Sequence, residues 1–568
     1  MFEMRFSSWD IGGFDRDTAV EFCRGGINPL VSVLLASRGI KKIDEAHAVI
    51  GDDPLPFYDP FLLADMDKAV SRINEAVEAD EHIAVYGDYD VDGMTAVAIV
   101  AIWLDTMGAD FEIYIPGRFD EGYGLNIPAL DLLKSRGTKL VITVDCGITA
   151  IEEAEHAKAI GLDLVITDHH ECRGDIPDAC AVVDPKRPDC DYPFKALAGV
   201  GVAFKLVNAL EGDHLSDEIF ERYGEFVALG TVADVMPVVG ENRELIRRGL
   251  GILNSSPRPG FRSLLREVSI EPGKISASTI GFILAPRLNA AGRMGQTELS
   301  VALLLTENTE EADELALKLC CLNTERRNLE QEILEEATAM LPKAEPNEPV
   351  VLARRGWNQG VTGIIAAKMV ELYKLPVIII SIDDDGVGRG SCRSIGSFAI
   401  YDALCSCEDI LLNFGGHEMA AGVTVAEENI EMLQQRLTDI YRRHPEAITA
   451  NSLKLDFEVE KPELLTIPNI EAMENLEPFG RGNPHPCMCI LEAVLSSVQS
   501  IGTGKHTRLK VEKSGHNLDC IFFSVPVSDL GVSEGMLVDL AFEPQVNEFR
   551  GRSSVQLQLF DIRASKVQ

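Results

Sequence analysis

The sequence has 568 residues, which is too long for one hydrophobic core and predicts three or four domains. Hydrophobic residues make up 46% of the chain and charged residues 25%, values that exclude a largely disordered protein and predict a chain that folds throughout. The 52 basic and 90 acidic residues give a formal net charge of −38, which argues against a protein that binds polyanions over its whole surface. Clustered arginines and bound cations can still make one groove positive.

The first 75 residues contain helix-like segments but no catalytic candidates. An amphipathic pattern spans 17–36, and a proline-rich stretch, DDPLPFYDP, follows at 52–60. We expect residues 1–75 to form an N-terminal helical lead-in that packs on the domain after it.

Strand-like and helix-like segments alternate between residues 76 and 305. The strand-like runs are HIAVY (82–86), FEIYIP (111–116), KLVITV (139–144), DLVIT (163–167) and AVV (181–183). Repeated β–α units of this kind predict an α/β domain with a mostly parallel sheet and helices on both faces. Ligands of such sheets bind outside the carboxyl ends of the strands.

Acidic and imidazole side chains follow several of these strands at their carboxyl ends. They are Asp88, Asp90 and Asp92 after the first strand, Asp145 after the third, and Asp168, His169 and His170 after the fourth. A further carboxylate, Asp234, lies in the apolar stretch ALGTVADVMP, where a charge is costly without a partner. Carboxylates this close repel one another unless cations neutralise them, and hard divalent ions prefer oxygen ligands, while imidazole adds manganese, iron and zinc as candidates. Taken alone, Asp168 would fit a helix cap beside two surface histidines equally well, so the prediction of a metal site depends on the whole set.

A long, charged, helix-like segment follows at 306–345, with apolar residues at heptad-like spacing. A coiled-coil dimer would have this pattern. We favour the simpler interpretation of a helix that connects two domains.

Residues 346–450 have the pattern of a second, smaller α/β domain, in which the runs VVLAR and PVIII flank a helix. Two glycine-rich stretches, GVGRGSCRS and FGGHEMAAG, allow close approach of a backbone. We expect them to place Arg389, Ser391, Arg393 and His417 in loops, although tight hairpins with exposed arginines would look the same. Residues 451–568 then consist of short strand-like runs between turns, which predict a small antiparallel β-barrel.

Four short motifs resemble, in order, those of the DHH phosphoesterase family: GDYDVDG (87–93), VDCG (144–147), TDHH (167–170) and GTVADVMP (230–237). The resemblance continues through PGRFDEGYGLN, LAGVGVAFKL, PRLNAAGRM, GRGSCRS and FGGHEMAAG, and therefore covers nearly the whole chain. Within that family, the sequence resembles the bacterial single-strand-specific 5′-exonucleases. One position departs from the pattern of many smaller DHH enzymes, because Tyr86 stands where they have a histidine, and Asp88 is the candidate that compensates.

The resemblance implies two divalent cations, Mn²⁺ or Mg²⁺. Asp145 would bridge them, Asp90 and Asp88 would complete one site, and Asp92, His169 and Asp234 would complete the other. His170 and Asp145 are the implied catalytic residues. Because adjacent side chains of an extended chain point in opposite directions, we expect His170 to face away from His169, toward the substrate. Asp168 would orient the neighbouring imidazole rather than bind metal.

The resemblance also implies the substrate-binding residues and the names of the remaining domains. The substrate-binding set is Arg118, Asn289, Arg293, Ser391, Arg393, Gly415, Gly416 and His417. Residues 76–305 would form the DHH domain, 346–450 the DHHA1 domain and 451–568 an oligonucleotide-binding (OB) fold. OB folds bind single strands through a positive groove with stacking aromatic rings. The candidates for this role are Lys505, His506, Arg508, Lys510, Phe522, Phe523, Phe549, Arg550 and Arg552, although aromatic residues at alternate strand positions are more often core.

These observations together predict a metal-dependent exonuclease that degrades single-stranded DNA from its 5′ end to mononucleotides, in repair and recombination. We expect a monomer, with single-strand binding protein and a helicase as candidate partners. Two alternatives remain open: a phosphodiesterase acting on cyclic dinucleotides or very short RNA, and a non-enzymatic nucleic-acid scaffold. A C-terminal barrel speaks against the first, and the complete set of ligand-type residues against the second.

The predicted location is the cytoplasm, without a membrane. Thirteen cysteines occur without a Cys-x-x-Cys pair, and we interpret them as reduced thiols. The start, MFEMRFSSWD, lacks a signal pattern, and the most apolar run, 97–104, is far shorter than the roughly 20 residues of a membrane span.

Overall fold

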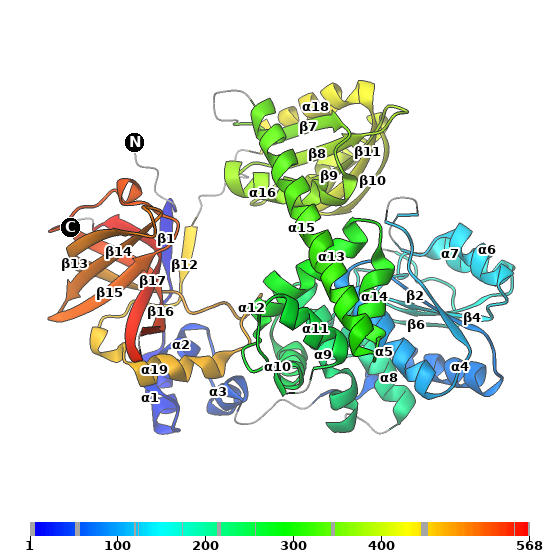
Figure 1. Ribbon diagram of the computed structural model, residues 1–568, viewed down its shortest axis with the longest axis horizontal. Helices are drawn as coiled ribbons and strands as arrows, with labels where there is room; N and C mark the ends of the chain where they lie inside the picture. Colours follow the sequence, from blue (N-terminus) through cyan, green and yellow to red (C-terminus); the bar gives the residue numbers. More distant parts are fainter. Residues whose placement is uncertain are drawn as a thin grey trace. The chain divides into compact units, whose positions relative to one another are not determined.

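The structure is a computed structural model (Figure 1). It describes residues 6–51, 57–118, 121–122, 124–172, 174–212, 217–255, 257–341, 347–444, 452–549 and 551–565. By its contacts the chain divides into two compact units, a larger one of Phe57–Thr449 and a smaller one that joins Met1–Pro56 to Ala450–Gln568. Among the described residues no helix has the length and apolar character to cross a membrane.

The larger unit begins with a five-stranded parallel sheet in the order β3-β2-β4-β5-β6, which confirms the predicted α/β domain. Its strands are β2 (Ile83–Gly87), β3 (Phe111–Tyr114), β4 (Leu140–Val144), β5 (Asp163–Thr167) and β6 (Ala181–Val183). The helices beside it are α4 (Met66–Glu78), α5 (Val91–Thr106), α6 (Ile127–Ser135), α7 (Ile151–Ala159) and α8 (Gly199–Glu211), with the short η1 (Pro60–Leu62) before them.

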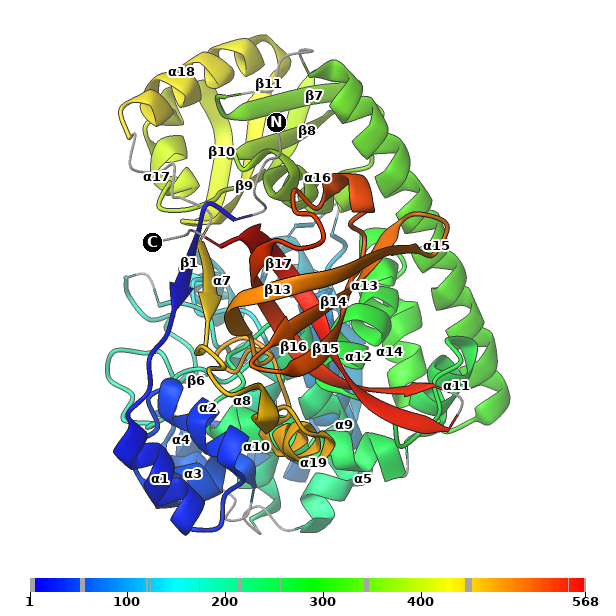
Figure 2. The same ribbon diagram turned by 90° about the vertical axis from the view of Figure 1, so that its left-hand side faces the viewer.

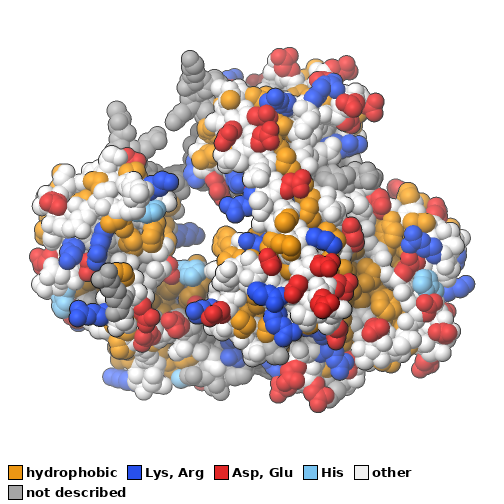
Figure 3. All heavy atoms as spheres, viewed as in Figure 1, with side chains coloured by type: hydrophobic (Ala, Val, Ile, Leu, Met, Phe, Trp, Pro, Cys, Tyr) orange, Lys and Arg blue, Asp and Glu red, His pale blue; other side chains and the backbone are white. Residues whose placement is uncertain are grey.

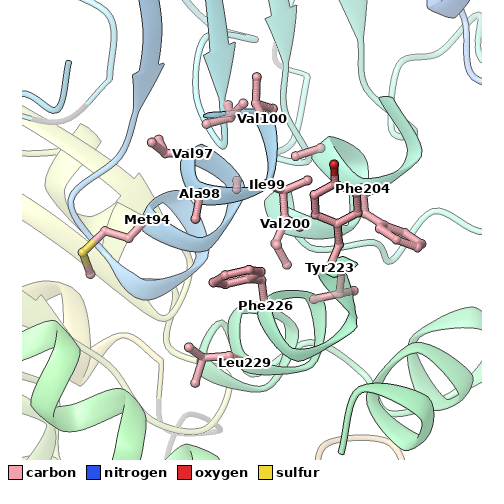
Figure 4. Close-up of a cluster of buried hydrophobic side chains, with 14 of the residues drawn as sticks. Met94, Val97, Ala98, Ile99, Val100, Val200, Phe204, Tyr223, Phe226 and Leu229 are labelled. Atoms are coloured by element: carbon pink, nitrogen blue, oxygen red, sulfur yellow. The ribbon is translucent and has the colours of Figure 1, made fainter. Parts of the chain in front are cut away.

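The central strands are buried on both faces, which explains their continuous apolar sequences. In β2, Ile83 and Val85 pack with α4, α5 and α8, whereas Ala84 and Tyr86 pack with α6 and α7 on the opposite face. Figure 4 shows this core, in which Val97 of α5 lies near the strands and Phe226 of α9 (Asp217–Ala233) packs on the other side of α5. Since α5 is enclosed in this way, it is apolar around its whole circumference.

A helical layer continues this core and leads to a long helix. It consists of α9 (Asp217–Ala233), α10 (Gly240–Ser255), α11 (Pro259–Glu267), α12 (Ala277–Thr279), η2 (Ile280–Leu284), α13 (Ala285–Arg293), α14 (Thr297–Leu305) and α15 (Thr309–Met340). Helix α15 contributes Leu315 and Leu319 to the first core and Ile333 to the core of the second sheet. The predicted connecting helix is thereby confirmed.

The second sheet of the larger unit is mixed, in the order β10-β11-β9-β8-β7. Its elements are β7 (Val350–Arg355), α16 (Gln359–Tyr373), β8 (Val377–Ile382), β9 (Val387–Arg393), α17 (Ile400–Cys405), η3 (Glu408–Ile410), β10 (Leu411–His417), β11 (Ala420–Ala426), η4 (Glu427–Asn429) and α18 (Ile430–Arg442).

One expectation about this sheet is wrong. His417 is the last residue of strand β10, and Arg389, Ser391 and Arg393 do not lie in a loop but in strand β9. This strand pairs with β8 on one side and β11 on the other, so both of its edges are hydrogen-bonded. The glycines between the polar residues reflect packing, because a Cβ on Gly390 would lie 2.7 Å from the side chain of Ile380.

The smaller unit contains a closed five-stranded barrel in the order β13-β14-β15-β17-β16, which faces the viewer in Figure 2. Its strands are β13 (Met488–Ile501), β14 (His506–Lys513), β15 (His516–Phe522), β16 (Leu537–Phe549) and β17 (Arg552–Ala564). The barrel was expected to be antiparallel, but β15 and β17 pair in parallel. β13 and β15 run in the same direction because each pairs antiparallel with β14. β17 also runs in that direction, since β16 pairs antiparallel with both β13 and β17, so the neighbours β15 and β17 are parallel.

The expectation that residues 1–75 pack on the domain after them holds for the end of that stretch, where Met66 and Ile73 of α4 lie in the core of the parallel-sheet domain. The N-terminal segment before it packs instead with the barrel. Its elements are β1 (Ser8–Ile11), α1 (Arg16–Arg24), α2 (Pro29–Ser37) and α3 (Ile43–Ile50). Phe22 and Leu34 share one core with barrel residues such as Leu540, and β1 pairs in parallel with β12 (Ser452–Leu455). The remaining elements are η6 (Pro462–Leu464), α19 (Ile467–Glu471), η7 (Ala472–Leu476) and η8 (Val527–Asp529). The apolar face of α2 therefore matches a partner near the other end of the sequence, a pairing that local pattern cannot reveal.

Candidate metal centre and substrate cleft

The six predicted metal ligands converge at the carboxyl edge of the parallel sheet. Their ligand atoms form groups within 4.8 Å of one another: Asp88 with Asp90 and Asp145, and Asp92 with His169 and Asp234. A third group joins Asp145 and His169 to His170. Residues from four separate segments of the chain thus meet at one place.

The backbone is shaped to present these groups. Asp145 directly follows β4 and has a φ of +60°, a left-handed conformation that non-glycine residues adopt mainly at turns and functional sites. Helix α8 begins beside it, and a Cβ on Gly199 would lie only 2.4 Å from Asp145 Oδ1. Glycine at the start of α8 is therefore required by close approach.

The first turn of α8 also fixes Asp92. Its two carboxylate oxygens accept hydrogen bonds from the backbone N–H groups of Gly199, at 2.7 Å, and Val200, at 2.8 Å. A helix N-terminus carries partial positive charge, so it stabilises a buried carboxylate. Asp90 is held differently, as the N-cap of α5, where its Oδ1 accepts from Gly93 N at 3.1 Å.

His169 offers a lone pair to the centre. Its Nδ1 donates a hydrogen bond to the backbone carbonyl of Leu197 at 3.0 Å, since a carbonyl can only accept. Nε2 is then the unprotonated nitrogen of the neutral ring, and it lies 3.1 Å from Asp145 Oδ1, 3.6 Å from Asp234 Oδ2 and 3.7 Å from Asp92 Oδ2. In metal-binding histidines one ring nitrogen typically binds the metal, while the other donates a hydrogen bond that fixes the orientation of the ring.

The electrostatics of the site favour a cation. Burial, and then repulsion by neighbouring carboxylates, raise the pKa of Asp88, Asp92 and Asp145 well above the ordinary value. Burial, followed by the nearby His170, lowers the pKa of His169 to about 3, so the ring is neutral. Among the described residues, Asp88 Oδ1 is buried without a hydrogen-bond partner. Oxygen ligands with one or two imidazoles are the donor set of a manganese or magnesium centre, and the residues present fit such ions.

Asp168 has a different environment from these carboxylates. Its Oδ1 accepts from His170 Nδ1 at 2.7 Å and from His169 N at 2.7 Å, and its Oδ2 accepts from Ile148 N at 2.9 Å. Burial alone would lower the pKa of His170, but the hydrogen bond and the charge of Asp168 raise it to about 9.

The expectation that the two histidines point in opposite directions is wrong. Their ring centroids lie 4.5 Å apart with the planes at 58°. Strand β5 ends at Thr167, so the alternation of an extended strand no longer applies at residues 169 and 170. His170 nevertheless lines the cleft described next.

A cavity of about 910 Å³ lies beside the centre, between the two sheets of the larger unit. Asp168 and His170 line it from the first sheet, and Arg389, Gly415 and His417 from the second. Among the predicted substrate residues, Gly416 also lines this cavity. The sheet edge that carries the candidate metal ligands and the glycine-rich strands therefore face one shared space.

The predicted arginines form a second cluster. Burial, and then the positive charges of Arg118 and Arg326, lower the pKa of Arg293 to about 10, with Arg393 adding to the effect. Arg293 Nη1 donates to the carbonyl of Gly360 at 2.9 Å, which joins α13 to α16. Ser391 lies within the same region, because its Oγ is 3.0 Å from Thr362 Oγ1 in the first turn of α16.

Some residues of the site could not be singled out in the sequence. Arg326 lies on α15, in the stretch NTERRN, whose charges look like those of any exposed helix. The Leu197 carbonyl and the α8 N-terminus act through their backbone and carry no side-chain signal. Asn289, a predicted substrate residue, accepts a hydrogen bond at its Oδ1 from Val91 N at 3.1 Å and so holds the segment that carries Asp88, Asp90 and Asp92.

Comparisons with known proteins agree with this architecture. The DHH family N-terminal domain matches residues 82–231, the DHHA1 domain residues 347–443 and the RecJ OB domain residues 455–561. The single-stranded-DNA-specific exonuclease RecJ of Bacillus subtilis is 39% identical over 99% of this chain and 71% of its own length. The crystal structure of RecJ from Thermus thermophilus in complex with Mn²⁺ matches with a TM-score of 0.84 and 28% identity, covering 99% of this chain and 80% of that chain. Its Mg²⁺ complex matches with a TM-score of 0.79 over 99% and 79% of the two chains, at the same identity.

The identity, the extent of the alignment and the order of the three domains all lead to the same assignment, and this chain belongs to the RecJ family of single-stranded-DNA-specific exonucleases.

Proposed function

We propose that this protein hydrolyses phosphodiester bonds of single-stranded DNA from the 5′ end and releases mononucleotides. The observation that carries the proposal is the convergence of His169 Nε2 with three carboxylates at a sheet edge that opens into a large cleft. Carboxylates this close repel one another, and bound cations would offset this repulsion and also attract a phosphate group.

Two divalent ions, Mn²⁺ or Mg²⁺, would be held here. The groups Asp88–Asp90–Asp145 and Asp92–His169–Asp234 support two separate sites, and the position of Asp145 beside both His169 and Asp88 supports its role as the shared ligand. Bound ions of this kind activate a water molecule and stabilise the negative charge that develops on the phosphoryl group.

His170 is the side chain that this proposal places against the scissile phosphate. It lines the cleft, and Asp168 holds its Nδ1 so that the opposite edge of the ring is presented to the substrate. The charge of Asp168 favours a protonated ring, which donates a hydrogen bond to a phosphate oxygen. Asp168 thus acts as a positioning residue.

Arg118, Arg293 and Arg393 would receive the terminal 5′-phosphate, with Ser391 beside them. Burial, and then repulsion by neighbouring arginines, lowers the pKa of Arg293 and Arg393, and this environment supports an anion as a further partner of the cluster. Guanidinium groups suit this role because they bind phosphate oxygens through paired hydrogen bonds. A pocket that closes over a terminal phosphate would exclude a continuing chain and so impose attack from an end.

Gly415 and Gly422 would form the floor on which the strand lies. They are directly opposite each other in β10 and β11, they are exposed, and both line the cleft. No atom of the described residues beyond its chain neighbours lies within 4 Å of a Cβ placed on Gly415, so packing among them does not explain the glycine. Close approach of a nucleic-acid backbone does explain it.

The barrel would add a platform for a longer strand. Arg508 and Lys510 project outward from β14 while Thr507, Leu509 and Val511 point into the core. Phe523 and Phe549 are 46% and 65% exposed, as stacking rings must be, whereas Phe522 is core. Lys505 and Arg552 are exposed and His506 is half-buried, while Arg550 lies outside the described residues. A platform of this kind serves a polymer rather than a dinucleotide; we place the protein as a monomer on single-stranded DNA, with single-strand binding protein and a helicase as its partners.

Replacing Asp145 by Asn should abolish catalysis without disturbing the fold, because Asn is isosteric and tolerates the left-handed backbone at this position. We expect cleavage of a labelled single strand in Mn²⁺ to fall about a thousandfold or more, with strand binding in the absence of turnover largely kept. The matched control is Asp178→Asn, an exposed carboxylate of the same domain that pairs with Lys158. Turnover within a few-fold of the wild type in Asp145→Asn would exclude the shared-ligand role.

Replacing Arg393 by Ala should remove the preference for a 5′-phosphate. We expect the rate on 5′-phosphorylated strands to fall about a hundredfold, since a buried charge-assisted contact is lost, and Mn²⁺ binding to persist. The assay compares strands that differ only in a 5′-phosphate or 5′-hydroxyl, and Arg436→Ala, on the exposed surface of the same domain, is the control. Digestion that starts at the 3′ end, or an unchanged end preference, would contradict the pocket.

Two neighbouring glycines should respond differently to Ala. Gly415→Ala should leave thermal stability unchanged and raise KM for single strands, because the added methyl enters the cleft. Gly416 has a φ of +144°, and a Cβ there would lie 2.4 Å from the Ala421 Cα, so Gly416→Ala should lower the free energy of unfolding by about 1 to 3 kcal/mol. A Gly415→Ala protein with wild-type KM would show that the strand does not cross this floor.

A further inference from the structure

Tyr89 lies next to both the candidate metal ligands and the arginine cluster. It stands between Asp88 and Asp90 in the first metal-binding segment, and it lines the cleft. The guanidinium carbon of Arg118 lies over its ring, 4.7 Å from the centroid. This distance is well within the range of a cation–π contact.

The surroundings of Tyr89 differ from those of Tyr86, the nearest other tyrosine in the sequence. Tyr86 is fully buried in the sheet, where its hydroxyl donates to the Gly124 carbonyl at 2.9 Å and its ring stacks on Tyr114. Tyr86 is therefore a core residue. Tyr89 is only half-buried, so filling the core does not account for it.

The backbone of the same segment is held by α13. Asn289 Oδ1 accepts from Val91 N at 3.1 Å, and a Cβ on Gly292 would lie 2.5 Å from the Tyr89 carbonyl oxygen. Helix α13 thus packs directly on the Tyr89 peptide. The next residue of the helix, Arg293, belongs to the arginine cluster.

One rigid segment therefore connects the carboxylates to the arginines. Tyr89 stands between two candidate metal ligands in the sequence, and helix α13 packs against its peptide group. Through its ring it holds the guanidinium of Arg118. A long arginine side chain would otherwise sample several positions, and immobilising it in advance lowers the entropic cost of binding an anion.

We propose that Tyr89 is a positioning residue that fixes the Arg118 guanidinium relative to Asp88 and Asp90, and thereby sets the distance between the bound 5′-phosphate and the bond that is cut. This inference depends on the proposed function, in which Arg118 receives the terminal phosphate. By holding Arg118 in one position, the ring would fix the terminal phosphate at the distance that places the first internal phosphodiester at the metal centre. The aromatic face, rather than the hydroxyl, performs this role.

The test compares Tyr89→Phe, which keeps the aromatic face, with Tyr89→Leu and Tyr89→Met, which remove it. The full-length protein is assayed in Mn²⁺ on single strands with a 5′-phosphate or a 5′-hydroxyl, and KM, kcat and product length are measured. We expect Tyr89→Phe to keep the end preference within about twofold. Both aliphatic variants should raise KM for phosphorylated strands about tenfold, with a smaller change in kcat and with dinucleotides among the products.

A double-mutant cycle separates this role from a general disturbance of the site. If Tyr89 acts through Arg118, Tyr89→Leu should cause no further loss of end preference in an Arg118→Ala background. Mn²⁺ titration and thermal unfolding of each variant report on the metal site and the fold independently of activity.

Three outcomes would overturn the proposal: aliphatic variants that behave like Tyr89→Phe, a Tyr89→Phe variant as impaired as Tyr89→Leu, or additive losses in the cycle. Should Tyr89→Leu fail to fold, the Met variant decides between the same outcomes. A wild-type enzyme without any preference for a 5′-phosphate would instead remove the terminal-phosphate pocket itself, which is a failure of the proposed function and is recognised before any variant is compared.

Discussion

The constraint on which this structure depends is the burial of several carboxylates together at one edge of the parallel sheet. Asp88, Asp92 and Asp145 are each at most 3% exposed, and charges of the same sign at this depth destabilise a fold unless something opposes them. The protein supplies part of the compensation through the backbone N–H groups of α8, which bind both oxygens of Asp92. Bound cations would supply the remainder, and the raised pKa values of these carboxyl groups indicate that protons take their place until cations bind. The close approach of Gly199 and the left-handed backbone of Asp145 are further consequences of placing so many ligands at one sheet edge.

The strongly negative overall charge is compatible with a nucleic-acid substrate because the relevant charges are local. Figure 3 shows Asp and Glu side chains spread over the drawn face with Lys and Arg among them, so no single sign covers it. The arginine cluster is partly buried, and in that environment each positive charge is screened less by water and salt than one on the surface. An acidic exterior with a buried basic pocket would disfavour indiscriminate binding along a duplex and favour recognition of an end.

Sequence patterns predicted the fold of this protein well where structure is local. Five buried parallel strands, the long α15 and the barrel all follow from period, length and turn residues. Most of the candidate metal ligands could be proposed because they follow strands whose carboxyl ends must meet, and the resemblance to the DHH family supplied the role expected of each. Most of the errors have a common physical origin in long-range pairing, and one arose from the exact point at which a strand ends. Strand β9 looked like a loop because of its glycines, yet its neighbours β8 and β11 satisfy both edges. The N-terminal helices packed with a barrel at the other end of the chain, and the orientation of His170 depended on where β5 stops. The Arg326 side chain and the α8 N–H groups could not be predicted at all, since their roles arise from position rather than residue type.

The central claim is that two cations occupy the two ligand groups and share Asp145. The most direct test is a crystal structure of the protein soaked in Mn²⁺, with anomalous diffraction measured at the manganese absorption edge. The account predicts two anomalous peaks about 3.5–4 Å apart, one bounded by Asp88, Asp90 and Asp145 and the other by Asp92, His169 and Asp234. A single peak, or peaks that leave Asp145 outside the coordination of either ion, would contradict it.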